Sequence, residues 1–149
     1  MSLISYFKKR NLKNSKEPRV NSKKNKKLIY IIQKHKASHL HYDLRLEFNG
    51  VLKSWALPKI PPKQKNLKRL AIQVEDHPIS YADFEGTIPE GNYGAGKVEI
   101  WDKGYFKLIE KTKSKIEIKI FGKKVSGNYV LLNAKLSGDK KNWLFFRIN

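Results

Sequence analysis

The pattern of hydrophobic and polar positions changes near residue 28. Residues 1–27 carry few apolar positions apart from a short run at Leu3–Phe7, where we expect a short helical start. From Leu28 onward, apolar residues occur in short runs or at every second position, which is the period of β-strands. The change predicts two parts: a mobile arm at 1–27 and a folded domain at 28–149.

Nine segments of the second part have strand patterns, with Gly, Asn, Lys and Ser between them. Asn49-Gly50 tolerates the positive φ angles of a type I′ turn, so it predicts a hairpin. No long helical pattern interrupts the strands. The fold class expected is therefore mostly β, a single-domain antiparallel barrel with short helical or loop excursions and a basic N-terminal arm. The expected strands are Leu28–Gln33, His41–Phe48, Val51–Leu57, Leu70–Glu75, Lys97–Trp101, Tyr105–Glu110, Lys115–Phe121, Tyr129–Leu132 and Trp143–Ile148.

Charge narrows the class of partner. The chain has 149 residues, 40% of them hydrophobic, and 32 basic residues against 13 acidic ones give a net charge of +19. Residues 1–27 contribute +9, from ten basic residues and Glu17. Such an excess favours polyanions, because lysines that neutralise phosphates release condensed counterions. A ribosomal-type or chromatin-type binder, or simply a lysine-rich composition, would explain the charge equally well.

Several classes of protein are excluded or disfavoured. The chain has no cysteine, so disulfides and thiolate metal sites are impossible. No apolar run approaches the roughly 20 residues that span a bilayer, and the first residues are too weakly apolar for a secretory signal. We expect an intracellular, cytoplasmic protein with no membrane partner.

Three of the four histidines fall within seven residues, at His35, His39 and His41. Alternate side chains of a strand share a face, so Asp43 and Arg45 should project together with His41. The opposite face should enter the core with Leu40, Tyr42, Leu44 and Leu46.

Two imidazoles and a carboxylate suit a divalent transition ion such as Mn²⁺ or Zn²⁺. Arg45 keeps its proton, so it would clamp a phosphate rather than bind the metal. The alternative is a solvated polar strand face whose histidines share no ligand. His39 has the right strand parity but sits at the beginning of the strand, where a turn is equally compatible with its position.

Two further segments carry candidate chemistry. Glu75-Asp76-His77-Pro78 follows an apolar strand, and Pro78 cannot continue a ladder, so His77 should lie at a strand end. There it could protonate a leaving oxygen or hold a phosphate oxygen, unless it belongs to an ordinary polar turn. Residues 84–97 are rich in glycine but lack the Gly-Lys-Ser/Thr ending of a nucleotide-binding loop, so they predict a tight loop close to backbone or substrate.

Taken together, these segments resemble the 3′-phosphoesterase domain at the N-terminus of bacterial DNA ligase D and its stand-alone relatives. The motif order is specific and covers nearly the whole chain, although the last segment fits more loosely. The N-terminal Leu3, Tyr6, Lys9-Arg10 and Glu17-Pro18 are also similar to the family's opening pattern. The matching segments are Gln33–Glu47, Gly50–Lys59, Lys68–Ala71, Val74–Pro78, Tyr81–Gly86, Ile88–Gly96 and Trp143–Arg147.

The resemblance implies roles for nine residues. His35, His41 and Asp43 would bind the catalytic ion, typically Mn²⁺ in this family, with Zn²⁺ or Co²⁺ as alternatives. Arg45 and His77 would hold the scissile phosphate, and His77 would also act as the general acid. The remaining implied residues are Lys59 and Arg69, which would add positive charge around the phosphate, and Glu75 and Tyr81, which would complete the pocket. His39 falls outside the implied metal set.

The implied activity is that of a metal-dependent 3′-phosphoesterase that heals 3′ ends of DNA or of RNA–DNA primer–templates for repair by non-homologous end joining. It would remove a 3′-terminal ribonucleoside and then convert the remaining 3′-phosphate to a hydroxyl. The chain has no Lys-x-Asp-Gly ligase motif, so joining would need a separate DNA ligase, and we expect the phosphoesterase to be a monomer.

Two departures from the family pattern affect the expected activity. Asn11 stands where the family usually has Asp, which predicts weaker removal of the ribonucleoside, and Ile60–Asn66 differs from the usual loop. Two rival hypotheses stay open: a degenerate member that grips DNA ends without cutting, and a metal-dependent phosphodiesterase acting on RNA or small cyclic nucleotides.

Overall fold

The computed structural model describes residues 27–92, 94–135 and 138–149, and almost every ordered element in them is a strand. A short 3-10 helix, η2 (Ile79–Asp83), stands between the strands β4 and β5. The strands are β1 (Leu28–Lys36), β2 (Leu40–Phe48), β3 (Val51–Leu57), β4 (Arg69–Pro78), β5 (Gly86–Ile88), β6 (Gly96–Lys111), β7 (Lys115–Phe121), β8 (Ser126–Asn133) and β9 (Asn142–Arg147).

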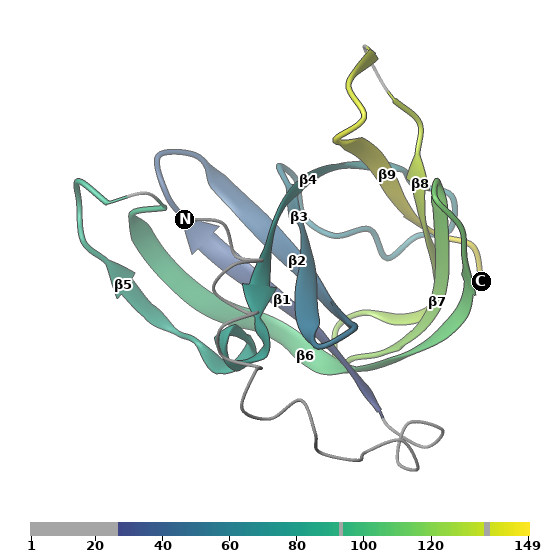
Figure 1. Ribbon diagram of the computed structural model, residues 1–149, viewed down its shortest axis with the longest axis horizontal. Helices are drawn as coiled ribbons and strands as arrows, with labels where there is room; N and C mark the ends of the chain where they lie inside the picture. The colour runs from purple at the N-terminus through teal and green to yellow at the C-terminus, as the bar shows by residue number, and fades with distance from the viewer. Residues whose placement is uncertain (1–26, 93, 136–137) are drawn as a thin grey trace.

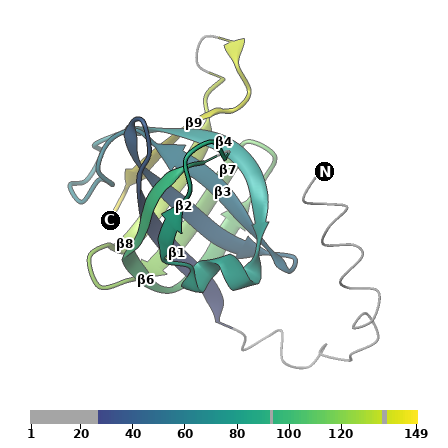
Figure 2. The same cartoon turned by 90° about the vertical axis from the view of Figure 1, so that its left-hand side faces the viewer.

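Eight of the strands close a barrel. They pair in the order β1-β2-β3-β4-β9-β8-β7-β6, every pair is antiparallel, and β6 pairs back with β1 (Figure 1; Figure 2). Closure leaves no unpaired sheet edge within this ring. The predicted mostly β, antiparallel barrel is therefore confirmed.

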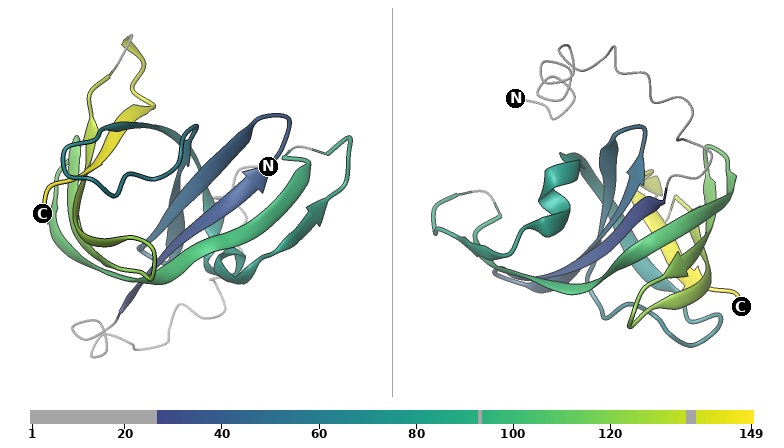
Figure 3. Two further views of the ribbon diagram at one scale, coloured as in Figure 1. Left: turned by 180° about the vertical axis from the view of Figure 1, so that it is seen from behind. Right: turned by 90° about the horizontal axis from the view of Figure 1, so that it is seen from below.

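The long strand β6 serves two structures at once. Its second part pairs with β7 inside the barrel, from Tyr105 to Lys111. Its first part, Gly96–Val98, pairs with β5. This pairing uses the same edge of β6 that pairs with β7 further along the strand. The segment that contains η2 and β5 therefore stands outside the barrel, on the side of β1 and β2 away from β7–β9 (Figure 1; Figure 3).

This arrangement gives β1, β2 and β3 two buried faces. The barrel interior is filled by large side chains from the whole ring, among them Trp55, Tyr129 and Phe145, each at most 1% exposed. A second, smaller cluster lies on the outer face, where Ile31 and Leu52 pack against Ala82 of η2. Fully burying an apolar side chain contributes about 1.5–3 kcal/mol, so both layers stabilise the barrel.

The hairpin predicted at Asn49-Gly50 is confirmed, with φ angles of 51° and 83°. Three details differ from the prediction. Lys97–Trp101 and Tyr105–Glu110 are parts of the single strand β6, because Gly104 continues the ladder instead of breaking it. The loop predicted at 84–97 contains β5, and Leu40 is 45% exposed because it begins β2 at the rim, above the core.

The N-terminal features lie outside the described residues. These features are the short helix expected at Leu3–Phe7, the mobile arm and the position of Asn11. No helix in residues 27–92, 94–135 or 138–149 is long and apolar enough to cross a membrane.

Candidate metal and phosphate site

A cavity of about 510 Å³ lies on the outside of the barrel, between β1–β4 and the segment that follows η2. It receives side chains from strands that are far apart in the sequence. Its lining comprises His35, Ala37, Ser38, His41, Asp43, Arg45, Ala56, Val74, Glu75, His77, Tyr81, Ile88, Asn92, Gly94 and Ala95. Seven of the nine predicted site residues are among them.

Strand β2 divides its side chains as its alternation predicted. Tyr42 and Leu44 enter the barrel core, whereas Asp43 and Arg45 point outward. These two charged side chains are nevertheless only 6% and 4% exposed, because the η2–β5 segment covers the outer face. Charges that leave water need partners, so the contacts of this pair decide what the cavity can bind.

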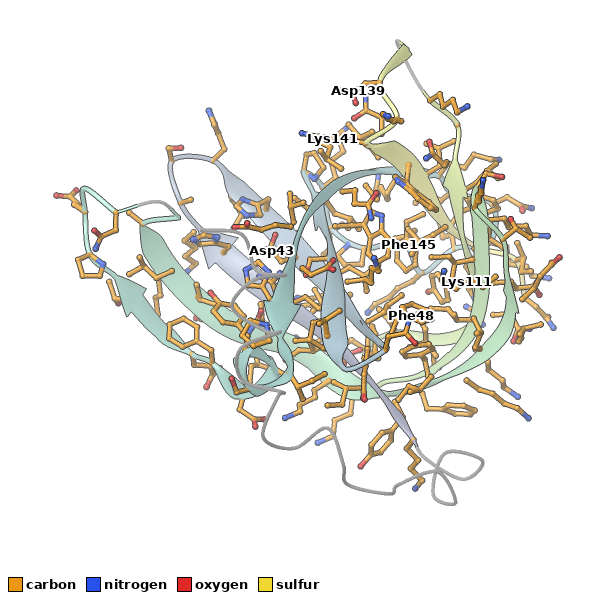
Figure 4. The ribbon with its side chains drawn as sticks, viewed as in Figure 1. Asp43, Phe48, Lys111, Asp139, Lys141 and Phe145 are labelled. Atoms are coloured by element: carbon orange, nitrogen blue, oxygen red, sulfur yellow. The ribbon has the colours of Figure 1, made fainter. Side chains whose placement is uncertain are left out.

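Three predicted metal ligands converge in the cavity. His35 and His41 are direct partners across the β1–β2 ladder, and their ring centroids lie 4.7 Å apart. His35 Nδ1 lies 3.6 Å from one Asp43 carboxylate oxygen, and His41 Nε2 lies 3.3 Å from the other. One ligand atom from each of the three residues falls within 4.8 Å of the other two, close enough to share one ion. Figure 4 shows Asp43 between the barrel strands and the β5 side of the molecule.

Main-chain carbonyls orient both imidazoles. His35 Nε2 lies 2.8 Å from the Gly94 oxygen, and His41 Nδ1 lies 3.1 Å from the His39 oxygen. A carbonyl oxygen only accepts, so each of these nitrogens carries the proton. In their neutral form, the two rings therefore present the lone pairs of His35 Nδ1 and His41 Nε2 toward Asp43. Such fixing by an outer carbonyl is usual for metal-binding histidines.

The donor set fits a cation. Burial alone would raise the pKa of Asp43, but contacts with His35 and His41 and the charge of Arg45 outweigh it, so its pKa is lowered and the carboxylate is ionised. The Asp43 contact raises the pKa of His41 against the opposing effect of burial. When both rings are neutral, two lone pairs and a carboxylate face one another and repel, and either a proton on His41 or a bound cation relieves this repulsion. Two His and one carboxylate suit a divalent transition ion with open positions for substrate.

Arg45 is a fixed cation beside this cluster. Its Nε donates to Gln33 Oε1 at 2.7 Å, and its Nη1 donates to Ser54 Oγ at 2.8 Å. Its Nη2 lies 3.5 Å from Asp43, and the guanidinium stands 4.8 Å over the Tyr81 ring. Burial lowers the pKa of Arg45 and Asp43 opposes that shift, yet a guanidinium stays charged. Held on several sides, it can bind phosphate with little loss of side-chain entropy.

His77 reaches the cavity through a bulge in β4. Ser54 pairs with Val74 and Leu52 pairs with His77, so two residues of β4 lie opposite Lys53 alone. Without the extra residue, alternation from Val74 would send His77 to the barrel interior. The prediction that His77 lies at a strand end is confirmed, since β4 ends at Pro78.

The His77 ring is held as a neutral imidazole. Its Nδ1 lies 3.0 Å from the Glu75 carbonyl oxygen, an acceptor, and 3.3 Å from Arg45 Nη1, a donor. The shorter contact assigns the proton to Nδ1, which leaves Nε2 as the free nitrogen. Burial, and then the charge of Arg45 with Nη1 3.3 Å from Nδ1, lowers the pKa of His77 to about 4 from its ordinary 6.5. A phosphate anion in the cavity would raise that pKa again, because opposite charge favours the imidazolium.

Tyr81 and Glu75 complete the wall, and the Tyr81 ring packs against His77 with 4.8 Å between ring centroids and a tilt of 55°. Burial raises the pKa of the Tyr81 hydroxyl. Lys59 and Arg69 are not among the lining residues. Arg69 starts β4 with the parity of buried Ala71, and its Nε donates to the Ile60 carbonyl at 2.9 Å, so their phosphate role stays a prediction.

Comparison with known proteins identifies the family of the chain that forms this cavity. Residues 33–133 match the family model for the DNA ligase D 3′-phosphoesterase domain. That range begins on β1 before His35 and contains every member of the metal cluster and the Arg45–His77 pair. The chain belongs to the DNA ligase D 3′-phosphoesterase domain family.

Curated relatives of this chain are much longer proteins. The multifunctional non-homologous end joining protein LigD of Pseudomonas aeruginosa is 43% identical over 155 residues, covering 97% of this chain and 18% of the relative. The LigD proteins of Mycobacterium tuberculosis and Mycolicibacterium smegmatis are each 44% identical and cover 80% of the chain. The chain spans less than a fifth of the length of each of these relatives.

One residue beside the candidate site was missed by sequence reasoning. Gln33 is fully buried, accepts from Arg45, and donates through Nε2 to the Tyr81 and Phe84 carbonyls at 2.8 and 3.1 Å. It therefore ties the arginine to the η2 cover. Its strand parity with His35 was a usable signal, since a glutamine two residues before a candidate ligand shares that ligand's face.

Proposed function

We propose that this chain is a metal-dependent phosphoesterase that removes ribonucleosides and phosphates from nucleic-acid 3′ ends before ligation. One observation carries the proposal: the triad of His35, His41 and Asp43 opens into the same cavity as Arg45 and His77. A protein that only binds DNA has no need of such a set. Family membership supports the same conclusion.

The triad would hold Mn²⁺, or Zn²⁺ or Co²⁺ in its place. When bound, such an ion supplies a Lewis acid for the phosphoryl oxygens. Arg45 would hold nonbridging oxygens of the scissile phosphate, because its position is already set by Gln33 and Ser54. Glu75 and Tyr81 would position the imidazole of His77, the first through its carbonyl and the second through its ring.

His77 would act as the general acid through Nε2. In the free protein its lowered pKa keeps it neutral at pH 7, so it cannot donate from that nitrogen. Binding of the phosphate would raise its pKa and load the proton, which Nε2 would then pass to the leaving oxygen. Protonation would thus depend on the presence of substrate.

The decisive experiment uses primer–templates that end in a ribonucleotide or a 3′-phosphate, with and without Mn²⁺. We expect Mn²⁺-dependent conversion of the 3′-phosphate to a hydroxyl, and slower ribonucleoside removal because of Asn11. Binding without any change of the end would favour the DNA-gripping rival, and hydrolysis of cyclic nucleotides alone would favour the other. A substrate lacking the penultimate 2′-hydroxyl tests whether that group is the nucleophile of the first step, which equal cleavage would exclude.

The cellular setting follows from the same proposal. The relatives' names place them in non-homologous end joining, and we propose that this chain prepares DNA ends for the same pathway inside the cell. It would act as a monomer and pass the healed end to a separate DNA ligase.

A further inference from the structure

A second cavity, of about 400 Å³, lies at the end of the barrel where β6 and β8 finish and β7 and β9 begin. Five of its lining residues are lysines, and none is Asp or Glu. The lysines come from four separate stretches of the chain: Lys53 on β3, Lys111 at the end of β6, Lys113 in the following turn, and Lys140 and Lys141 before β9. We call this group the lysine pocket.

The charge of the lysine pocket is poorly compensated. Lys53 is the only one of the five that forms a salt bridge with another described residue, Asp76 at 3.7 Å. Asp139 lies nearby, but its carboxylate accepts the backbone N–H of Lys141 and does not line the cavity (Figure 4). Like charges gathered around one cavity repel, so the arrangement favours an anion among them.

A buried hydrogen-bond donor without a partner also borders the lysine pocket. Trp55 is fully buried and borders the cavity, and its indole N–H has no hydrogen-bond acceptor in the described part of the chain. Leaving a buried donor unsatisfied costs about 1–3 kcal/mol.

The lysine pocket is separate from the candidate catalytic cavity, although both use β3. Lys53 and Trp55 border the lysine pocket, whereas Ala56 lines the catalytic cavity and Ser54 contacts Arg45. In Figure 4, Lys111 and Lys141 lie on the β7–β9 side of the molecule, away from Asp43.

We propose that the lysine pocket binds backbone phosphates of a nucleic-acid strand at a distance from the 3′ end that is processed. The inference rests on the proposed function for the identity of the ligand as a nucleic acid. Lysines gathered from separate stretches of the chain, with no carboxylate lining the same cavity, suit the repeating charge of a phosphodiester backbone and read no base sequence. The pocket would thus make long substrates bind better than short ones.

The test compares two triple variants. The first is Lys111→Gln/Lys113→Gln/Lys141→Gln, and the matched control is Lys107→Gln/Lys119→Gln/Lys123→Gln, which removes equal charge from exposed positions on β6, β7 and the turn after β7. Fluorescence anisotropy with a primer–template ending in an ordinary 3′-hydroxyl measures affinity as a function of salt. The pocket variant should bind about tenfold more weakly or worse, and its salt slope should fall by about 0.9 for each phosphate that the lysines no longer neutralise.

A second arm separates a strand from a free phosphate compound. The chain has three tryptophans, and Trp55 and Trp143 border the lysine pocket whereas Trp101 does not. Indole N–H signals of Trp55 and Trp143 should shift with the primer–template and stay in place with a mononucleotide at the same phosphate concentration. Equal shifts with the mononucleotide would assign the pocket to small phosphorylated molecules and overturn the proposal.

The outcomes keep the two proposals apart. If the control variant weakens DNA binding equally, the DNA is attracted by the overall charge of the protein and the lysine pocket is not a specific site. This conclusion would hold whether or not the protein cleaves 3′ ends. The pocket variant should bind DNA more weakly and still cleave a 3′-phosphorylated mononucleoside at the wild-type rate. That pair of results supports the lysine pocket. If wild-type protein binds DNA through these lysines but cleaves nothing, the proposed enzymatic function fails and the pocket stands.

Discussion

At the scale of single residues, the site depends on how each ring is held. His41 and His35 are fixed by main-chain carbonyls, so their side chains are positioned before any ion binds. His39 contributes only its carbonyl to this arrangement, and its exposed side chain is not in the metal cluster. Neighbouring histidines two positions apart therefore have different roles.

The first prediction contrasts His41→Ala with His39→Ala. Loss of an outer-shell partner costs up to about 100-fold in metal affinity, and loss of a direct ligand should cost at least as much. His41→Ala should therefore weaken Mn²⁺ binding by about 100-fold or more and abolish turnover. His39→Ala keeps the carbonyl and should stay within a few-fold of wild type. Electron paramagnetic resonance of free Mn²⁺ measures binding, and equal damage by both variants would show that the ligands are wrongly assigned.

The second prediction concerns His77 and pH. Its folded pKa, about 4, lies below its ordinary 6.5, so the unfolded chain binds the extra proton first. This group's contribution to stability is therefore present above pH 6.5 and is lost as pH falls toward 4. His77→Gln should flatten the decline of unfolding free energy over that range, measured by urea titration. An unchanged decline would mean that His77 has an ordinary pKa.

At the scale of elements, the barrel strands supply faces and the irregularities aim the functional groups. The bulge in β4 puts His77 on the face of Ser54, and the turn into β6 brings the Gly94 carbonyl to His35. Gly96 allows β6 to lie close enough to the end of β1 for the Gly94 carbonyl to reach His35. A Cβ there would overlap the Lys36 carbonyl oxygen and lie 2.9 Å from Ala37 Cα, at the end of the strand that carries His35.

The third prediction is that Gly96→Ala damages both the fold and the metal site. Backbone atoms would have to separate at the β1–β6 contact, at a cost of about 1–3 kcal/mol, and His35 would move away from Asp43. Gly91→Ala is the control, because Gly91 also has a positive φ, +88°, but has nothing within 4 Å of an added Cβ. Chemical unfolding and Mn²⁺ titration report the two effects. Equal losses in the two variants would attribute the damage to φ strain alone.

At the scale of the whole molecule, the positive charge is divided between the N-terminal segment and the barrel. Residues 1–27 carry +9 of the total +19, which leaves +10 for 28–149. Every barrel strand lies within 28–149, and β1 closes the ring with β6. The barrel therefore contains all the contacts that close it.

The fourth prediction is that residues 28–149 fold cooperatively by themselves and keep Mn²⁺ binding. Their affinity for a primer–template should fall, and the salt slope should decrease by about 0.9 for each phosphate that the first 27 residues neutralise. Calorimetry and anisotropy measure these properties. Failure of 28–149 to unfold cooperatively would place the domain boundary before residue 28.

Metal binding provides a fifth prediction at the same scale. An ion that binds the folded chain stabilises it by mass action, by about 2.7 kcal/mol at a hundred times the dissociation constant. Mn²⁺ should therefore raise the melting temperature of the wild-type protein, and EDTA should reverse the increase. Asp43→Asn should show no such increase, and a full increase in that variant would place the ion elsewhere.

The sequence by itself determined most of the strands, the hairpin at Asn49-Gly50 and the division of β2 into two faces, but it did not reveal β5 or the continuity of β6. These features depend on local periodicity and turn chemistry, which are visible along the chain. Only the tertiary structure decided what is set by contacts between distant segments. The β4 bulge that aims His77, the burial of Gln33 under η2 and the gathering of five lysines at one barrel end all depend on which strands meet and in what register.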